Sequence, residues 1–330
     1  MAWGQTPKGG SEMSTMMHRA LGQTAYRVSV IGLRGWPGEP DDALAEPLDP
    51  NELISATQVA LDAGVSYLEL PLASGISQIE EAVGNALASR REHVVLAGVC
   101  GVPGLGTGRD SRVTRPEMII SLCEAALRRL RQDRLDVLHV RWPGVDLPVA
   151  DLMGTLGRLL ERGDIGAIGL SHYGYEGVSR ARRAGTVHVV RTPLSLFERE
   201  ATFDLVPFCQ EHGIAVVADD VLAGGWLASD ADLVALRRAA GSRPGRSARA
   251  EADRSAAVQL QELASEAGRT VGQLAMAWVL SEPGVTTGLA VSSRPSRVQD
   301  QLGASEWTIP EAIRGRIDDI LSERDRQLDR

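Results

Sequence analysis

Five ionisable residues stand within short apolar runs or at most two residues after them, so their side chains can meet in one site. They are Glu69, Arg141, His172, Arg191 and Asp219. A carboxylate or an imidazole can transfer a proton, and an arginine can stabilise a carboxylate or an enolate. Several charges in one concave site are costly unless they are paired or bind a ligand. The pattern therefore predicts either an acid–base site that binds a ligand or a structural ion pair between Glu69 and Arg141.

Eight apolar runs carry or precede these residues, and amphipathic segments separate them. The runs are 28–33, 65–70, 94–99, 135–140, 167–170, 187–191, 214–218 and 287–291. Continuous runs rich in β-branched residues are typical of parallel strands that are buried on both faces. Apolar residues recur at helical spacing within 79–87 and 271–279. The alternation predicts an α/β fold, one (β/α)8 TIM barrel over residues 17–330, with its site at the C-terminal ends of the strands.

Composition narrows the class of protein. The 330 residues are 43% hydrophobic and 24% charged, which is typical of globular chains. The net charge of -8 argues against nucleic-acid binding, and no apolar run reaches the ~18 residues of a membrane span. Cys100, Cys123 and Cys209 are far apart, which favours reduced thiols over a metal site or disulfides. We expect a cytoplasmic protein with a small-molecule substrate and neither nucleic-acid nor membrane partners, as a monomer or a homo-oligomer.

Three segments depart from the strand and helix pattern. Residues 1–16 are polar and predict a disordered leader. The acidic, proline-rich stretch 37–50 and the Asp/Arg/Gly/Ala-rich stretch 228–254 follow predicted strands, so both predict loops at the C-terminal face, the second partly helical. Thr114 and Glu117 have the spacing of a capping box, with Pro116 in the first turn of the helix.

Several stretches resemble the aldo-keto reductases. They are 19–24 (RALGQT), 28–33 (VSVIGL), 67–75 (YLELPLASG), 163–171 (GDIGAIGLS), 213–218 (GIAVVA) and 273–278 (QLAMAW). The resemblance covers residues 17–325 and implies an aldo-keto-reductase-type barrel whose bottom is closed by an N-terminal β-hairpin. It also implies hydride transfer between a nicotinamide cofactor and a carbonyl.

In that family a tyrosine donates the proton, a lysine tunes it, an aspartate holds the lysine, and a histidine orients the carbonyl. The positions that match these four residues hold Ser74, Val99, Glu69 and Arg141. The single lysine of the chain is Lys8, which precedes the first predicted strand. The resemblance therefore implies a member whose tetrad is replaced and whose proton transfer falls to other residues.

The cofactor positions implied by the resemblance are Ser171, Asp219, Ser292, Arg297 and Gln301. Ser292 and Arg297 fit a 2′-phosphate at the start of a helix. Asp219 replaces the aromatic residue that stacks on the nicotinamide, and it would bring a negative charge beside that ring. NADP(H) is therefore one candidate cofactor, and a site without any cofactor is the alternative.

The expected substrate pocket is largely aromatic. Its residues are Trp36, Ser74, Trp142, Arg191, Tyr173 and Trp226. Tyr173 is alternatively a loop anchor, and His139 is expected to be a core histidine. Cys100 ends a strand, but no paired base is evident that would make it a nucleophile.

Three functions stay open at this point. The first is redox-neutral chemistry on a small organic molecule in bacterial secondary metabolism, such as cyclisation, dehydration or isomerisation. In it Glu69 and His172 transfer protons, and Arg141 and Arg191 stabilise an anion. The second is an NADP(H)-dependent carbonyl or enone reductase whose proton donor is Tyr173, His172 or water. The third is a non-catalytic nucleotide-binding or scaffold protein.

Overall fold

Eight parallel strands close into a barrel in the computed structural model, which describes residues 16–35, 49–72, 77–87, 90–101, 115–142, 147–229 and 247–328. The strands are β3 (Ile31–Arg34), β4 (Tyr67–Leu72), β5 (Val95–Cys100), β6 (Val137–Arg141), β7 (Ile168–Ser171), β8 (Val189–Pro193), β9 (Ala215–Asp219) and β10 (Val285–Val291). Because β10 pairs with both β9 and β3, the ring is complete. The predicted (β/α)8 barrel is confirmed.

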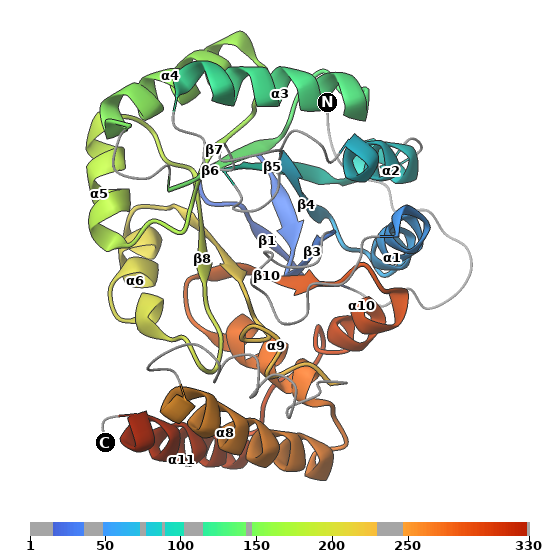
Figure 1. The fold of residues 1–330 in the computed structure, drawn as a ribbon, viewed down its shortest axis with the longest axis vertical. Helices are drawn as coiled ribbons and strands as arrows, with labels where there is room; N and C mark the ends of the chain where they lie inside the picture. The colour runs from blue at the N-terminus through green and yellow to red at the C-terminus, as the bar shows by residue number, and fades with distance from the viewer. Residues whose placement is uncertain are drawn as a thin grey trace.

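Helices surround the barrel, as Figure 1 shows, and α8 packs along α11 at one end of the molecule. The helices are α1 (Pro50–Asp62), α2 (Ser77–Leu87), α3 (Pro116–Leu130), α4 (Val149–Arg162), α5 (Tyr175–Ala184), α6 (Leu205–Glu211), α8 (Ser247–Glu266), α9 (Val271–Ser281), α10 (Pro295–Leu302) and α11 (Glu311–Leu328), with 3-10 turns η1 (Arg91–His93) and η2 (Glu200–Thr202). The apolar stripes predicted within 79–87 and 271–279 lie in α2 and α9 and pack into the core between helices and strands.

An N-terminal hairpin of β1 (His18–Ala20) and β2 (Arg27–Ser29) precedes the barrel. Its Leu21 and Val28 pack in one cluster with inward residues from the strand starts, such as Val95 and Val189, so the hairpin closes the bottom. Gly22, at φ +58, lies so close to residues 213–215 that a Cβ would meet the Gly213 carbonyl oxygen at 2.7 Å. Expecting one strand over 28–33 was wrong, because the chain passes there from hairpin to barrel.

Several boundaries differ from those that the sequence predicts. Helix α3 begins at Pro116, and its N-cap is Arg115 without a side-chain cap, so the expected start of the helix was wrong by one residue; Thr114 itself lies outside the described residues. Met16, the last residue of the expected leader, is buried, and residues 1–15 lie outside the described residues. Positions 36–48 and 230–246, which include most of both expected loops, also lie outside them. No described helix is long and apolar enough to cross a membrane.

Candidate active site

A layer of polar side chains fills the upper part of the barrel interior. Its members Arg34, Glu69, His139, Ser171, Arg191 and Asp219 come from six different strands, and each is at most 6% exposed. Side chains of a strand alternate between its two faces, so inward positions recur every second residue. The register sets Ser171 beside Arg191 and Arg34 beside Glu69, and this brings the charges of separate strands to one level.

Asp219 is the most strongly bound carboxylate of the polar layer. Its Oδ2 accepts a bond from Arg191 Nη2 at 2.6 Å, and its Oδ1 accepts one from Arg34 Nη1 at 2.7 Å. Burial alone would raise the pKa of Asp219, but Arg191, Arg34 and His172 outweigh it and hold that pKa well below its ordinary value. Asp219 is therefore ionised at any working pH, with its charge compensated by two guanidinium groups.

Glu69 binds Arg191 and not the expected Arg141. Arg191 Nε donates to Glu69 Oε1 at 2.9 Å, whereas Glu69 Oε2 has no hydrogen-bond partner within the described ranges. Burial raises the pKa of Glu69 to about 7, against the opposing effect of Arg191. Arg141 ends β6, in register with Ser171, and is half-buried. Burial lowers its pKa to about 10, and Arg191 adds to that effect.

His139 occupies the centre of the barrel as a neutral residue. Its Nε2 lies 2.8 Å from Tyr67 Oη, and burial lowers its pKa to about 3. Gly169, its neighbour in register on β7, leaves the space for the ring: a Cβ there would meet His139 Nδ1 at 2.3 Å. His139 is thus the core histidine that the sequence favours.

His172 stands at the mouth, directly after β7, and its side chain is 21% exposed. Its backbone has φ +59, and its N–H donates to the Arg191 carbonyl oxygen at 2.8 Å. Its Nε2 lies 3.3 Å from Asp219 Oδ2. Because Asp219 is ionised and can only accept, Nε2 carries the hydrogen and Nδ1 keeps its lone pair. Burial lowers the pKa of His172 although Asp219 opposes this, so the imidazole is neutral at pH 7.

The aromatic residues expected in the pocket are not equally accessible. The Trp142 side chain is exposed at 40%, and its ring meets that of Tyr173 edge-on at 4.7 Å. The Tyr173 hydroxyl is buried with no hydrogen-bond partner in the described part of the chain, and burial raises its pKa. Tyr173 is therefore poorly suited to donate a proton. Trp36 and Ser74 lie outside the described residues. The Cys100 thiol is fully buried, which raises its pKa and disfavours the nucleophilic thiolate.

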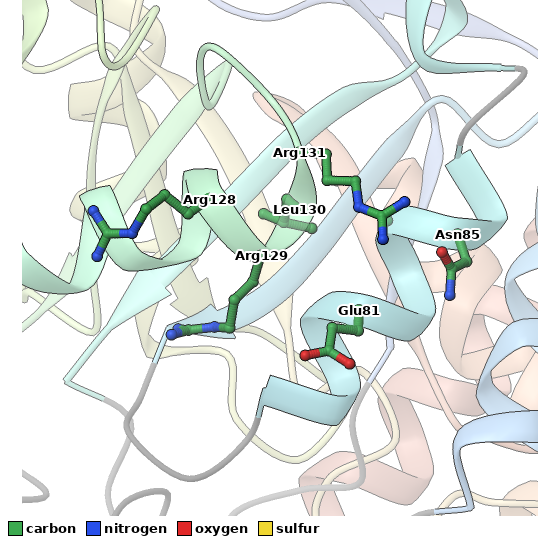
Figure 2. Close-up of a pocket in the computed structure, with 7 residues that line it drawn as sticks. Glu81, Asn85, Arg128, Arg129, Leu130 and Arg131 are labelled. Carbon is green, nitrogen blue, oxygen red and sulfur yellow. The ribbon is translucent and has the colours of Figure 1, made fainter.

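Two cavities differ in their relation to this mouth. One of about 480 Å³ lies between the loops after β8 and β9, where Phe197, Asp220, Trp226 and Arg249 line it. Asp220 directly follows the last residue of β9, so this cavity lies at the C-terminal face of the barrel. The other, of about 250 Å³, lies between α2 and α3 and includes Arg131 (Figure 2). Helix α3 ends there before β6 begins, so this second cavity belongs to the opposite end of the barrel.

The turn from β10 to α10 holds the expected phosphate-binding residues. Ser292 is buried, and its Oγ accepts from the Arg294 backbone N–H at 2.8 Å. Arg297 lies in the first turn of α10. Gln301 accepts from the Val291 N–H at 3.3 Å and donates to the Arg297 carbonyl at 3.1 Å, which ties the turn to the helix. The Ser292 hydroxyl and the Arg297 guanidinium, at the N-terminus of α10, are residue types that fit a phosphate group.

Arg34 is the site residue that the sequence reasoning missed. It ends β3 and supplies the second guanidinium to Asp219. The signal that identifies it is the one shared by Arg141 and Asp219, an ionisable residue directly after an apolar run. The catalytic, substrate-binding and cofactor-binding roles assigned to the other residues stay predictions.

Comparisons with known proteins agree with the barrel. The model of the aldo/keto reductase family matches residues 30–322. Aldo-keto reductase YhdN of Bacillus subtilis is 26% identical over 317 residues, which cover 93% of this chain and 94% of that protein. Probable aldo-keto reductase 1 of Glycine max is 26% identical over 290 residues, covering 86% and 83%. The glycerol dehydrogenase AKR11B4 from Gluconobacter oxydans shares the fold, with a TM-score of 0.76 at 24% identity, covering 95% of this chain and 97% of that one. The chain belongs to the aldo-keto reductase family.

Proposed function

We propose that this protein is an NADP(H)-dependent oxidoreductase of a carbonyl or alcohol group, in which His172 replaces the family's tyrosine as proton-transfer group. The observation that carries the proposal is the contact of His172 Nε2 with Asp219 Oδ2 at 3.3 Å, at a partly exposed position of the mouth. An imidazole that a buried carboxylate orients is a suitable general acid and base.

The residues present fit the phosphate end of the cofactor. Ser292, Arg294 and Arg297 at the start of α10 would hold its 2′-phosphate. At the other end, the two arginines bound to Asp219 remove the objection that a free carboxylate would lie beside the nicotinamide. When bound, NADP(H) supplies or accepts the hydride.

His172 would transfer the proton, and Arg141 would stabilise the charge on the substrate oxygen. Neutral His172 accepts the alcohol proton at Nδ1 when the alcohol is oxidised, and the imidazolium returns it to the carbonyl oxygen when the carbonyl is reduced. Arg141, at the end of the neighbouring strand, would stabilise the negative charge that develops on this oxygen. Reduction should therefore become faster as the pH falls through the pKa of His172.

Redox-neutral acid–base chemistry is the second candidate. It draws support from Ser171, a position that the family resemblance assigns to the cofactor, because its Oγ accepts from Arg191 Nη1 at 2.9 Å and is thereby held within the polar layer. It loses support from Glu69, which is fully buried and bound to Arg191, so its carboxylate has no access to a substrate. Of the expected proton-transfer pair, His172 alone keeps that access.

The test begins with a calorimetric titration with NADPH. Deuterated NADPH is then offered with 4-nitrobenzaldehyde and with glyceraldehyde, and label is sought in the alcohol product. His172→Gln should lower kcat/KM by ~10²- to 10⁴-fold while NADPH still binds. His93→Gln, at an exposed histidine of η1, is the matched control.

Each outcome separates the candidates. No NADPH binding up to millimolar concentration would end the hydride proposal. Isomerisation or dehydration of a substrate without NADPH would favour the redox-neutral alternative. NADPH binding without turnover across a panel of carbonyl compounds would favour the non-catalytic nucleotide-binding protein.

A further inference from the structure

A continuous series of contacts joins the barrel interior to His172. Glu69 Oε1 accepts from Arg191 Nε at 2.9 Å, and Arg191 Nη2 reaches Asp219 Oδ2 at 2.6 Å. The same Oδ2 lies 3.3 Å from His172 Nε2. Arg191 therefore links two carboxylates through different nitrogens. Asp219, held in place by Arg191, in turn orients the imidazole of His172.

Glu69 itself has no access to a substrate. Its side chain is 0% exposed, and Arg191, at 2% exposed, separates it from the mouth. Any influence of Glu69 on chemistry at His172 therefore acts through Arg191 and Asp219.

We propose that Glu69 is a positioning residue, which fixes Arg191 and Asp219 against His172 and sets the charge of the polar layer by holding or releasing a proton at Oε2. The part that concerns turnover rests on the proposed role of His172. The part that concerns the charge and orientation of His172 rests on the contacts alone.

The geometry identifies Oε2 as the oxygen that holds the proton. Oε1 is bound to Arg191, whereas Oε2 is buried and has no partner among the described residues. His139 Nε2 is 4.0 Å from Oε2, too far for a hydrogen bond, and its ring is neutral. An ionised oxygen without a donor is costly in a buried site, so protonation of Oε2 lowers that cost.

Titratable groups face Glu69 from its own strand and from four other strands. The facing groups are Tyr67 on its own strand, Arg34 on β3, His139 on β6, Arg191 on β8 and Asp219 on β9. With Tyr67 and His139 neutral, two arginines face one aspartate. The layer is neutral when Glu69 is ionised and carries one positive charge when Glu69 is protonated.

The sign of the coupling follows from this charge. Release of the Glu69 proton removes the positive charge and favours imidazolium at His172, so it raises the pKa of His172. The effect should be on the order of half a pH unit, because it acts through Arg191 and stays below the ~1 to 3 units of a directly contacting charge.

The experiment follows the ring signals of 13C-labelled histidine in the full chain by NMR, from about pH 5 to about pH 9. His172→Gln identifies the His172 signal. We expect the main transition of His172 below 6.5 and a smaller inflection near pH 7 from Glu69. Glu69→Gln should abolish the inflection near pH 7. Glu80→Gln, at another buried glutamate bound to an arginine, should leave it unchanged.

A wild-type His172 signal without an inflection near pH 7 would overturn the proposal, whether or not the variant folds. An inflection that survives in folded Glu69→Gln would do the same.

Kinetics separate this inference from the proposed function. In the wild type, kcat should change about threefold through pH 7, the factor that half a pKa unit corresponds to, and Glu69→Gln should lose this step with KM for NADPH unchanged. If the NMR coupling is present but kcat shows no such step in either protein, the positioning role stands and the catalytic role of His172 fails.

Discussion

Glu69 and Glu80 are both fully buried glutamates that bind an arginine, yet they bind it in different ways. Glu80 on α2 accepts from Arg129 of α3 with both oxygens, and the Arg129 side chain is 27% exposed. Glu69 uses one oxygen, and its partner Arg191 is 2% exposed and shared with Asp219. A pair that satisfies both oxygens holds two helices together. Burial raises the pKa of both glutamates, but only the charge of Glu69 lies within a group that also contacts His172.

Replacing the arginine should give the largest difference in stability between the two pairs. Arg191→Met leaves Glu69 and Asp219 buried without their shared partner, so we expect the free energy of unfolding to fall by about 3 to 5 kcal/mol. Arg129→Met should cost about 1 kcal/mol, because solvent already reaches this guanidinium and water can take its place. Urea denaturation followed by tryptophan fluorescence measures both. Equal losses would contradict the distinction.

Near each pair lies a glycine whose missing side chain allows another residue to approach closely. A Cβ at Gly169 would meet His139 Nδ1 at 2.3 Å, so Gly169→Ala should cost about 3 kcal/mol by overpacking the polar layer. A Cβ at Gly84 of α2 would lie 3.2 Å from the Leu130 carbonyl oxygen, and alanine gains about 1 kcal/mol in a helix. Gly84→Ala should therefore be nearly neutral in thermal unfolding. A neutral Gly169→Ala would show that the barrel centre is less tightly packed.

The pH dependence of stability should sharpen the comparison further. Burial raises the pKa of Glu69 from 4.5 to about 7, so the folded chain holds this proton more tightly than the unfolded chain. The stabilisation of the folded state by this proton is fully present below about pH 4.5 and is lost as the pH rises through about 7. As the pH rises from about 5.5 to about 8, the free energy of unfolding of Glu69→Gln should increase by about 2 kcal/mol relative to that of the wild type. Urea titrations at both pH values measure this gain, and a constant difference between the two proteins would refute it.

The smallest effect should come from the tyrosine beneath Glu69. Tyr67→Phe removes the hydroxyl that lies 2.8 Å from His139 Nε2, which should cost about 1 kcal/mol in thermal unfolding. Tyr175→Phe, at an exposed tyrosine, should cost nothing. A null result at Tyr67 would show that His139 does not depend on this bond.

The sequence predicts the barrel because each strand is a continuous apolar run, and such a run by itself indicates a strand that is buried on both faces. It also brings Glu69, Arg191 and Asp219 to one site, since all three lie at or near the ends of such runs. The ion-pair partners could not be derived in the same way. Whether Glu69 meets Arg141 or Arg191 depends on how distant strands are set against one another, and no local pattern encodes this, since Glu69 and Arg191 are 122 residues apart.

Other details depend on contacts across the barrel. The role of Gly169 appears once His139 occupies the space beside it. The lone pair on His172 Nδ1 follows from Asp219, which lies 47 residues away in the chain. The N-cap at Arg115 shows that a cap spacing in the sequence does not by itself decide where a helix starts.

The mutual compensation of charges in the polar layer has a consequence for redesign. Each of Arg34, Arg191, Asp219 and Glu69 is tolerated because the others are present, so their substitutions will not be additive. An aromatic residue in place of Asp219 alone would leave two buried guanidinium groups without their shared acceptor. A library that aims to alter this mouth should therefore vary Asp219 and Arg191 together. A single substitution at either position leaves a buried charge without its partner, so single-site scanning would reject changes that a paired substitution could accommodate.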